Sequence, residues 1–416
     1  MRDFFDLYLQ YTKDTEATAT FHRWSAIVGI GAYLERNVWV QHGASKIYPN
    51  HYVMLLGESG SRKSAAIKGF VRILKEAGYK TLAAEKTSKE KFSADLAAMH
   101  HDTDNPDDDL LWGDLDETAI TPILIANDEA NDFFGLNNIE FLSLLGSWWD
   151  YNGTYEVKYK TSKSDSIPNP TPSILVGNTP TNFSLAFPPT IIGQGFFSRI
   201  LLVHGERTRG KITWPTPPAP EATAAVVQAL QQIKASCIGE VVPTTEARKL
   251  ADHIYKGVDN VTDERFASYF NRRFTHLLKL STVVAASQGH TSIDEDVLIQ
   301  ANTYLTYIQN LMPKALGEYG RSADSAIVQK IMTHIQRSPT PVTLKEIAKQ
   351  VASDVSSMVM LRQIIEKLVH AEKVTWSGGG LVIVHQDLLA QVTESESRFV
   401  DFDTYLTPEE LKVKVA

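Results

Sequence analysis

Residues 57–64 read GESGSRKS, and this segment constrains the fold more than any other part of the chain. It lies between an apolar run, Tyr52–Leu56, and a stretch whose apolar residues have helical spacing, Ala65–Ala77. The segment fits the pattern G-x-x-x-x-G-K-[ST], except that Arg62 stands where the second glycine is usual. A strand, a loop of this kind and a helix in succession predict an α/β fold.

This loop has a direct chemical interpretation. Its backbone N–H groups can cradle anionic oxygens, and the N-terminus of the following helix adds a favourable dipole. Lys63 would reach the β- and γ-phosphates of a nucleotide, and the Ser64 hydroxyl would help to hold Mg²⁺, so ATP and Mg²⁺ are the expected ligands. The expected nucleotide contacts are Gly57, Glu58, Ser59, Gly60, Ser61, Arg62, Lys63 and Ser64. The alternative is a Gly-Ser turn before a helix that carries a surface lysine.

An acidic pair follows a second apolar run about 65 residues downstream. The segment ILIANDE predicts a buried strand at Ile123–Ala126 that ends in Asp128 and Glu129. Asp128 would orient Mg²⁺, directly or through water, and Glu129 would act as general base toward the attacking water. A solvated strand end is the alternative, and the upstream loop favours the catalytic interpretation.

A third apolar run, Ser173–Val176, is followed by Asn178. An asparagine at a strand tip beside a phosphate site can hold the attacking water or the γ-phosphate. It can also be an ordinary turn residue, since the sequence N-T-P is typical of turns. Strands that alternate with helices along this part of the chain predict a parallel sheet with crossover connections.

Arg199 directly precedes another apolar run, Ile200–Val203, which is an unusual place for a charge. In a ring ATPase such an arginine could reach the γ-phosphate held by the neighbouring subunit. An intrachain salt bridge is the alternative. Arg207 and Arg209 are rival candidates for the arginine finger.

The composition changes after Thr213, where WPTPPAPEA forms a proline-rich connector. The predicted fold class is α/β, with a P-loop parallel sheet covered by helices on both faces, a helical lid and a C-terminal winged helix. The predicted segments are an N-terminal helical segment (1–45), a P-loop core (46–213), a helical lid (214–320), a winged helix (321–386) and an acidic tail (387–416).

Charge and composition limit the partners. The chain has 416 residues and a net charge of −8, which argues mildly against a free DNA-binding domain, so local patches must decide. Residues 102–117 carry many carboxylates and no Lys or Arg. The single cysteine excludes an internal disulfide. No apolar run reaches the roughly 20 residues of a membrane span, and no cleavage pattern follows the N-terminus, so we expect a cytoplasmic protein without a membrane partner.

These pieces, in this order, resemble the AAA+ type of ring ATPase. More narrowly, the chain resembles P-loop ATPases of phage- and plasmid-borne replication modules, over about residues 18–310. The segments that carry the resemblance are YPNHYVMLLGESGSRKSAAI, ILIANDEANDFFG, PSILVGNTP, GQGFFSRILLV and the lid-like RRFTHLLKLSTVVAAS.

The resemblance implies a role for each matching residue. It places Walker A at Lys63 and Ser64, Walker B at Asp128 and Glu129, sensor 1 at Asn178 and the arginine finger at Arg199. A second, nucleotide-binding sensor would be Arg272 or Arg273. Arg62 departs from the family pattern, which puts the backbone geometry at the β-phosphate in question.

A lysine-rich hairpin is predicted between the acidic pair and Asn178. Lys158, Lys160 and Lys163 are interleaved with tyrosines, so they can neutralise phosphates while the rings stack on bases. In ring helicases a hairpin at this place projects into the central channel, where six copies would surround single-stranded DNA. An ordinary exposed hairpin is the alternative. The third helix of the predicted winged helix carries only Arg362 and Lys367 as basic residues, which are few for sequence-specific recognition of DNA bases.

Three functions follow as hypotheses. The first is a hexameric, ATP-driven DNA helicase of a phage or mobile-element replication system, with replication proteins binding the winged helix or acidic tail. The second is a DNA-binding AAA+ ATPase that loads a helicase or remodels a complex without unwinding. The third is a ring-forming interaction module whose slow ATPase is a switch.

Overall fold

The computed structural model describes residues 3–100, 119–158, 164–187, 191–192, 195–205, 210–257, 264–316 and most of 327–383. Lys160, Lys163, Arg207 and Arg209 lie outside the described residues, as do the acidic segment 102–117 and the tail 387–416. The described residues up to 316 form one compact unit, and those from 327 form a second.

A four-stranded sheet organises the first unit. Its strands are β4 (Thr121–Asn127), β7 (Pro170–Asn178), β3 (Tyr52–Leu56) and β8 (Ile200–His204), in that order, and every neighbouring pair is parallel. All residues of β3 and β7 are buried, because the sheet is covered on both faces, as parallel sheets usually are. The prediction of an α/β fold with a parallel sheet is confirmed.

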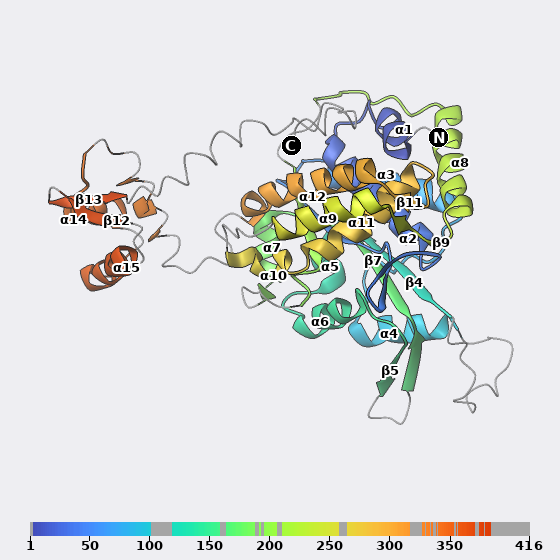
Figure 1. Ribbon diagram of the computed structural model, residues 1–416, viewed down its shortest axis with the longest axis horizontal. Coiled ribbons are helices and arrows are strands. Elements are labelled where there is room, and N and C mark those ends of the chain that lie inside the picture. The colour runs from blue at the N-terminus through green and yellow to red at the C-terminus, as the bar shows by residue number, and fades with distance from the viewer. Residues whose placement is uncertain are drawn as a thin grey trace. The chain divides into compact units, whose positions relative to one another are not determined.

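Helices surround this sheet (Figure 1). They are α1 (Phe4–Tyr11), α2 (Ala19–Leu34), α3 (Lys63–Glu76), α4 (Lys89–Ala98), α5 (Ala130–Phe134), α6 (Ile139–Trp148), α7 (Pro180–Ala186), α8 (Pro220–Ser236), α9 (Thr245–Lys256), α10 (Ala267–Phe270), α11 (Arg273–Ser287) and α12 (Glu295–Leu316). Thr18 caps α2, and all sixteen residues of this helix are buried between the sheet and its neighbours.

Short strands pair the N-terminal segment with the helical part of the chain after residue 220. Strand β1 (Val38–His42) pairs with β2 (Ser45–Ile47) on one side and with β9 (Gly239–Glu240) on the other. Strand β10 (Val242–Pro243) pairs with β11 (Ser292–Ile293). Two-residue strands have no periodicity to detect, so the sequence did not predict the last three.

Two strand predictions changed in extent. The sequence also predicts a short strand at 81–84, and the structure has only a single bridge there, between Leu82 and Leu124. Strand β7 begins at Pro170, three residues before the predicted start. Prolines at this end of β7 hid the strand, because proline lacks the N–H that a sheet ladder needs.

The predicted hairpin is present as β5 (Thr154–Lys158) and β6 (Ser164–Pro168), which pair antiparallel. It projects away from the body of the first unit (Figure 1). Asn169 alone separates β6 from β7, so the hairpin grows directly from the amino end of a central strand.

The second unit contains α14 (Leu344–Gln350), α15 (Met358–His370) and an antiparallel pair, β12 (Val374–Ser377) and β13 (Gly380–Ile383). Thr343 and Glu346 form a reciprocal capping box at the start of α14. The hydrophobic core of this second unit includes Ile327, Ile331 and Ile335, which have helical spacing. Helices α14 and α15 are followed by this antiparallel pair, and assignment of the unit as a winged helix stays a prediction. No helix among the described residues of either unit is long and apolar enough to cross a membrane.

Candidate functional site

The candidate phosphate loop (residues 57–62) leaves the carboxyl end of β3. A Cβ atom on Gly57 would lie 2.8 Å from Ser61 Oγ and 3.0 Å from the carbonyl oxygen of Gly205, so the backbone packs too closely for a larger residue. Gly60 has a φ of +86°, which also favours glycine. The loop is therefore a tight turn between β3 and α3.

Arg62 adopts the left-handed conformation, with φ 64° and ψ 24°. This explains why the pattern prefers glycine here, since a side chain with a Cβ atom costs about 1–2 kcal/mol in this conformation. Its Nε is paired with the Glu16 carboxylate, which also accepts a hydrogen bond from the Ile212 N–H at 2.7 Å. These hydrogen bonds, first from Ile212 and then from Arg62, lower the pKa of Glu16.

Lys63 is buried and curls back over the loop. Its Nζ donates to the carbonyl oxygens of Gly57 at 2.7 Å and Glu58 at 3.1 Å, and to Ser61 Oγ at 3.1 Å. Desolvation lowers the pKa of this lysine, and the charge of Glu129 opposes that shift. The ammonium group is thus held where the loop backbone converges, with an acid of the predicted pair close by.

Asp128 lies against the start of α3. Its Oδ2 accepts a hydrogen bond from Lys68 Nζ at 2.6 Å, and this bond, with a smaller contribution from the nearby Ser64 side chain, lowers the pKa of the carboxyl group. Gly177 of β7 makes the approach possible, because a Cβ atom there would lie 2.6 Å from the Asp128 carbonyl oxygen. The loop and the acidic pair therefore meet at the carboxyl edge of the sheet.

Asn178 lies between these two groups, since β7 separates β3 from β4. It is fully buried and pairs in register with Leu56, the last residue before the loop. Its Nδ2 donates to Asn131 Oδ1 at 2.9 Å, and its Oδ1 accepts from the Thr179 N–H at 2.9 Å. Asn178 thus connects the phosphate loop to the segment after the acidic pair.

Glu129 stands at the N-terminus of α5 and is exposed. Its backbone N–H donates to Asn127 Oδ1 at 2.9 Å, and Asn127 Nδ2 donates to the Glu85 carbonyl oxygen at 2.8 Å. This turn fixes the backbone of the acidic pair while the Glu129 carboxylate remains accessible to solvent.

The donor set at this edge fits Mg²⁺. The Ser64 hydroxyl and the Asp128 carboxylate are oxygen ligands of the kind that Mg²⁺ prefers, and they lie near enough for Ser64 to lower the pKa of Asp128. Two protein oxygens with remaining positions for phosphates and water are the usual arrangement for this ion. Sequence reasoning missed Lys68 here, although its i+4 spacing from Ser64 places both on one face of α3.

The predicted arginines lie elsewhere in the chain. Arg199 precedes Ile200, which pairs with Tyr52 at the amino edge of the sheet. Its Nη1 donates to the Gly195 carbonyl oxygen at 2.7 Å, and its Nη2 lies 3.6 Å from Asp150 Oδ1. The intrachain ion pair considered as the alternative is therefore present, and the finger role stays a prediction.

Arg272 and Arg273 also lie away from the candidate phosphate loop. Arg272 Nη1 is 3.4 Å from Asp150 Oδ2, at the same amino edge as Arg199. Arg273 is buried and binds side chains of α12, with hydrogen bonds to Gln309, Asn302 and Thr306 of 2.7 to 2.9 Å. Neither arginine is brought to the loop of its own chain, as a same-chain sensor would require.

The hairpin presents its lysine to solvent. Lys158 is exposed and lies 3.7 Å from Glu156, so part of its charge is balanced within the strand. Trp148, next to the hairpin, is buried and packs edge-on against Tyr155, so this tryptophan belongs to the core of the first unit. Trp149 is buried as well.

Arg36 anchors the base of the hairpin, a role the sequence did not suggest. Its Nε donates to Thr171 Oγ1 at 2.6 Å and its Nη1 to Asn152 Oδ1 at 2.9 Å, while Nη2 binds the Tyr151 carbonyl oxygen. The guanidinium also stacks over Tyr48, 4.3 Å from the ring centroid. The hairpin is thereby fixed to the start of β7.

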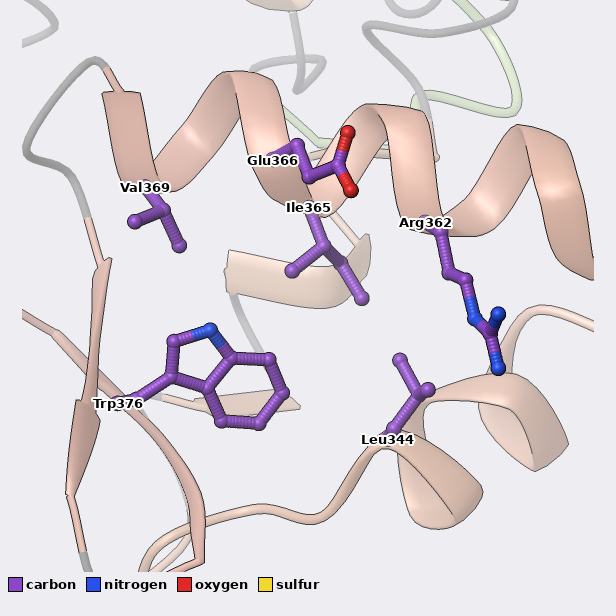
Figure 2. A pocket seen from close by; sticks show the side chains of 6 residues that line it. All are labelled: Leu344, Arg362, Ile365, Glu366, Val369 and Trp376. Carbon is purple, nitrogen blue, oxygen red and sulfur yellow. The ribbon is translucent and has the colours of Figure 1, made fainter.

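The second unit has a pocket of about 270 Å³ between α15, the start of α14 and the wing (Figure 2). Figure 2 shows Trp376 of β12 facing Ile365 and Val369, with Leu344 closing the pocket on the side of Arg362. Arg362 and Glu366 bring opposite charges to its lining. The pocket is mainly apolar, and it shares no residue with the phosphate loop.

Comparison with known proteins assigns no family or function to this chain, so its function is argued from the geometry described above. No protein-family model matches the chain, and no curated protein matches it either.

Proposed function

We propose that this protein is a Mg²⁺-dependent ATPase of the AAA+ P-loop type that acts on DNA as a ring, as a replicative helicase of a phage or mobile element. One observation carries the proposal: the Lys63 loop, Ser64 and Asp128 meet at one end of the sheet, with Asn178 between them. Asp128 and Asn178 are far from the Lys63 loop in sequence. Their convergence is what a shared phosphate and metal site requires.

Each residue has a role that its position supports. Lys63 would exchange its bonds to the loop carbonyl groups for bonds to the β- and γ-phosphates. Ser64 and Asp128 would hold Mg²⁺, which neutralises phosphate charge when bound. Glu129, exposed beside Lys63, would accept a proton from the attacking water, and Asn178 would orient that water or the γ-phosphate.

A ring explains the position of Arg199. This residue precedes β8 at the amino edge of the sheet, whereas the phosphate loop follows the carboxyl end of β3. The five residues of β3 span about 16 Å, which is longer than an arginine side chain. Arg199 can therefore act on a triphosphate only when that triphosphate is held by a neighbouring subunit. Hexameric assembly is part of the proposal.

The hairpin supports the choice of DNA as the partner. It projects from the first unit, carries Lys158 on its exposed side and is anchored by Arg36. A rigid arm with cations is suited to track the phosphates of single-stranded DNA in a channel. The second unit would contribute a winged helix for contacts with other replication proteins.

A strand-displacement assay on forked DNA with ATP, with particle mass measured in parallel, tests the proposal. The wild-type protein should unwind the fork as a ring, and Lys63→Ala should abolish ATP hydrolysis and unwinding. Lys75→Ala, an exposed lysine at the other end of α3, is the matched control and should retain both.

Other results of this assay identify the alternatives. DNA-stimulated hydrolysis without displacement would indicate a loader or remodelling ATPase. Hydrolysis that is indifferent to DNA would indicate an interaction module with an ATP switch. A Lys63→Ala variant that hydrolyses ATP at the wild-type rate would refute the ATPase site itself.

A further inference from the structure

One carboxylate lies between two arginines at the amino edge of the sheet. Asp150, which follows α6, places Oδ1 3.6 Å from Arg199 Nη2 and Oδ2 3.4 Å from Arg272 Nη1. The two arginines come from distant parts of the sequence, one before β8 and the other before α11. Their guanidinium groups are thus held side by side by a single acid.

The platform beneath this cluster is rigid. Trp149 is buried, and both guanidinium carbons lie 5.9 Å from its ring centroid. Lys279 of α11 approaches the same ring, with Nζ 4.4 Å from the centroid, and donates to Asn50 Oδ1 at 2.6 Å. Packing and hydrogen bonds therefore position the arginines before any ligand is bound.

Positive charge exceeds negative charge here. Arg199 and Arg272 together outweigh Asp150. Burial lowers the pKa of Lys279 to about 7, so this lysine adds only part of a positive charge near neutral pH. Burial is the largest cause of the lowered pKa of Arg199, and the charge of the neighbouring Arg272 lowers this pKa further. The exposed fraction is 47% for the Asp150 side chain, 33% for Arg272 and 12% for Arg199, so the acid is the partner most accessible to replacement. Such a cluster is suited to a multiply charged anion from outside the chain.

We propose that Arg272 acts together with Arg199 on the triphosphate bound by the neighbouring subunit, and that Asp150 is the positioning residue for the pair. The inference rests on the proposed function, because it requires a ring of ATP-binding subunits. It replaces the expectation that Arg272 or Arg273 senses the nucleotide of its own chain. The γ-phosphate oxygens take the place of the Asp150 carboxylate between the two guanidinium groups.

The placement of Arg272 supports this assignment over a same-chain role. Since it shares Asp150 with Arg199, the length of β3 separates it from its own phosphate loop as well. Arg273 is bound to α12 and contributes to packing of the lid instead. A single arginine of this kind contributes roughly 10³- to 10⁵-fold to the rate of phosphoryl transfer.

Mixing two inactive variants tests the inference. Lys63→Ala subunits cannot use their own site but keep both arginines, and Arg272→Ala subunits have an intact loop but lack one arginine. Each variant alone should have at most about a thousandth of the wild-type rate, since roughly 10³-fold is the lower end of the arginine effect. An equal mixture should regain activity at about a quarter of its interfaces, because neighbours in a ring meet head to tail.

A mixture of Lys63→Ala and Arg199→Ala is the positive control and should regain activity in the same way. If this control recovers and the Arg272→Ala mixture does not, Arg272 acts within its own subunit and the inference is overturned. If neither mixture recovers, both arginines lack the assigned role, and the inference is equally overturned. A wild-type protein that hydrolyses no ATP would instead refute the proposed function.

Nucleotide binding by dispersed subunits gives a second readout. With a fluorescent ATP analogue at low protein concentration, Arg272→Ala should bind with a Kd within twofold of wild type, whereas Lys63→Ala should bind much more weakly. Asp150→Asn should likewise keep this Kd while kcat falls, as expected for a residue that acts through the arginines. A weakened Kd in Arg272→Ala would contradict the inference.

Discussion

The left-handed conformation of Arg62 gives the most direct test of the loop geometry. We predict that Arg62→Gly is more stable than Arg62→Ala by about 1 kcal/mol. A side chain with a Cβ atom costs about 1–2 kcal/mol in this conformation, and glycine loses part of that gain through its more flexible unfolded chain, about 0.5–1 kcal/mol. Both variants lose the ion pair with Glu16, so that loss cancels in the comparison.

Denaturant unfolding of the two variants measures this difference, and thermal melting should show Arg62→Gly higher by roughly 2 °C. Glu16→Gln serves as the control, since it removes the ion pair and leaves the backbone strain unchanged. If Arg62→Ala proved as stable as Arg62→Gly, the loop would not hold a left-handed residue at this position. The explanation for the missing glycine would then be wrong.

Three further predictions follow from the site. Gly177→Ala should lower the free energy of unfolding by about 1–3 kcal/mol in urea, because its Cβ atom would press on the Asp128 backbone; unchanged stability would contradict the close approach. Lys68→Met should lower the Mg²⁺ concentration for half-maximal nucleotide binding up to about fivefold, since it frees Asp128 from a competing cation worth about 1 kcal/mol at most; a higher requirement would argue against this competition. His51 and His276 are buried, and desolvation is the main reason that their pKa is lowered to about 3. Between pH 6.5 and 3 the unfolded chain therefore binds more protons than the folded one. Unfolding free energy should therefore fall as pH drops through this window, by up to about 1.4 kcal/mol per pH unit for each histidine, and His276→Gln should fall less steeply.

Local signals predicted the central elements well. An apolar run before a glycine-rich turn located β3 and α3, and the acidic pair located the end of β4. Strand order could not be read from such signals, because it depends on contacts between distant segments, such as Thr121 with Pro170 and Tyr52 with Ile200. The position of β7 between β3 and β4 is what makes Asn178 central to the site.

The arginines show where sequence reasoning ended. Arg199 and Arg272 were each singled out, yet their shared partner Asp150 was not, because an aspartate after two tryptophans carries no local signal. Lys63, Ser64 and the acidic pair were found because their spacing reflects backbone geometry. Ion pairs between distant segments reflect the tertiary fold, which a single sequence does not display.

The nine residues of β7 fix the distance between two sites of the first unit. One end is Asn178, beside the candidate phosphate loop, and the other is Thr171, tied to Arg36 at the base of the hairpin. Deleting one residue between them would turn the side chains beyond the deletion to the opposite face. The number of residues in β7, and whether that number is odd or even, are therefore both constrained. Homologous chains should vary the residue types in this strand far more readily than the number of residues.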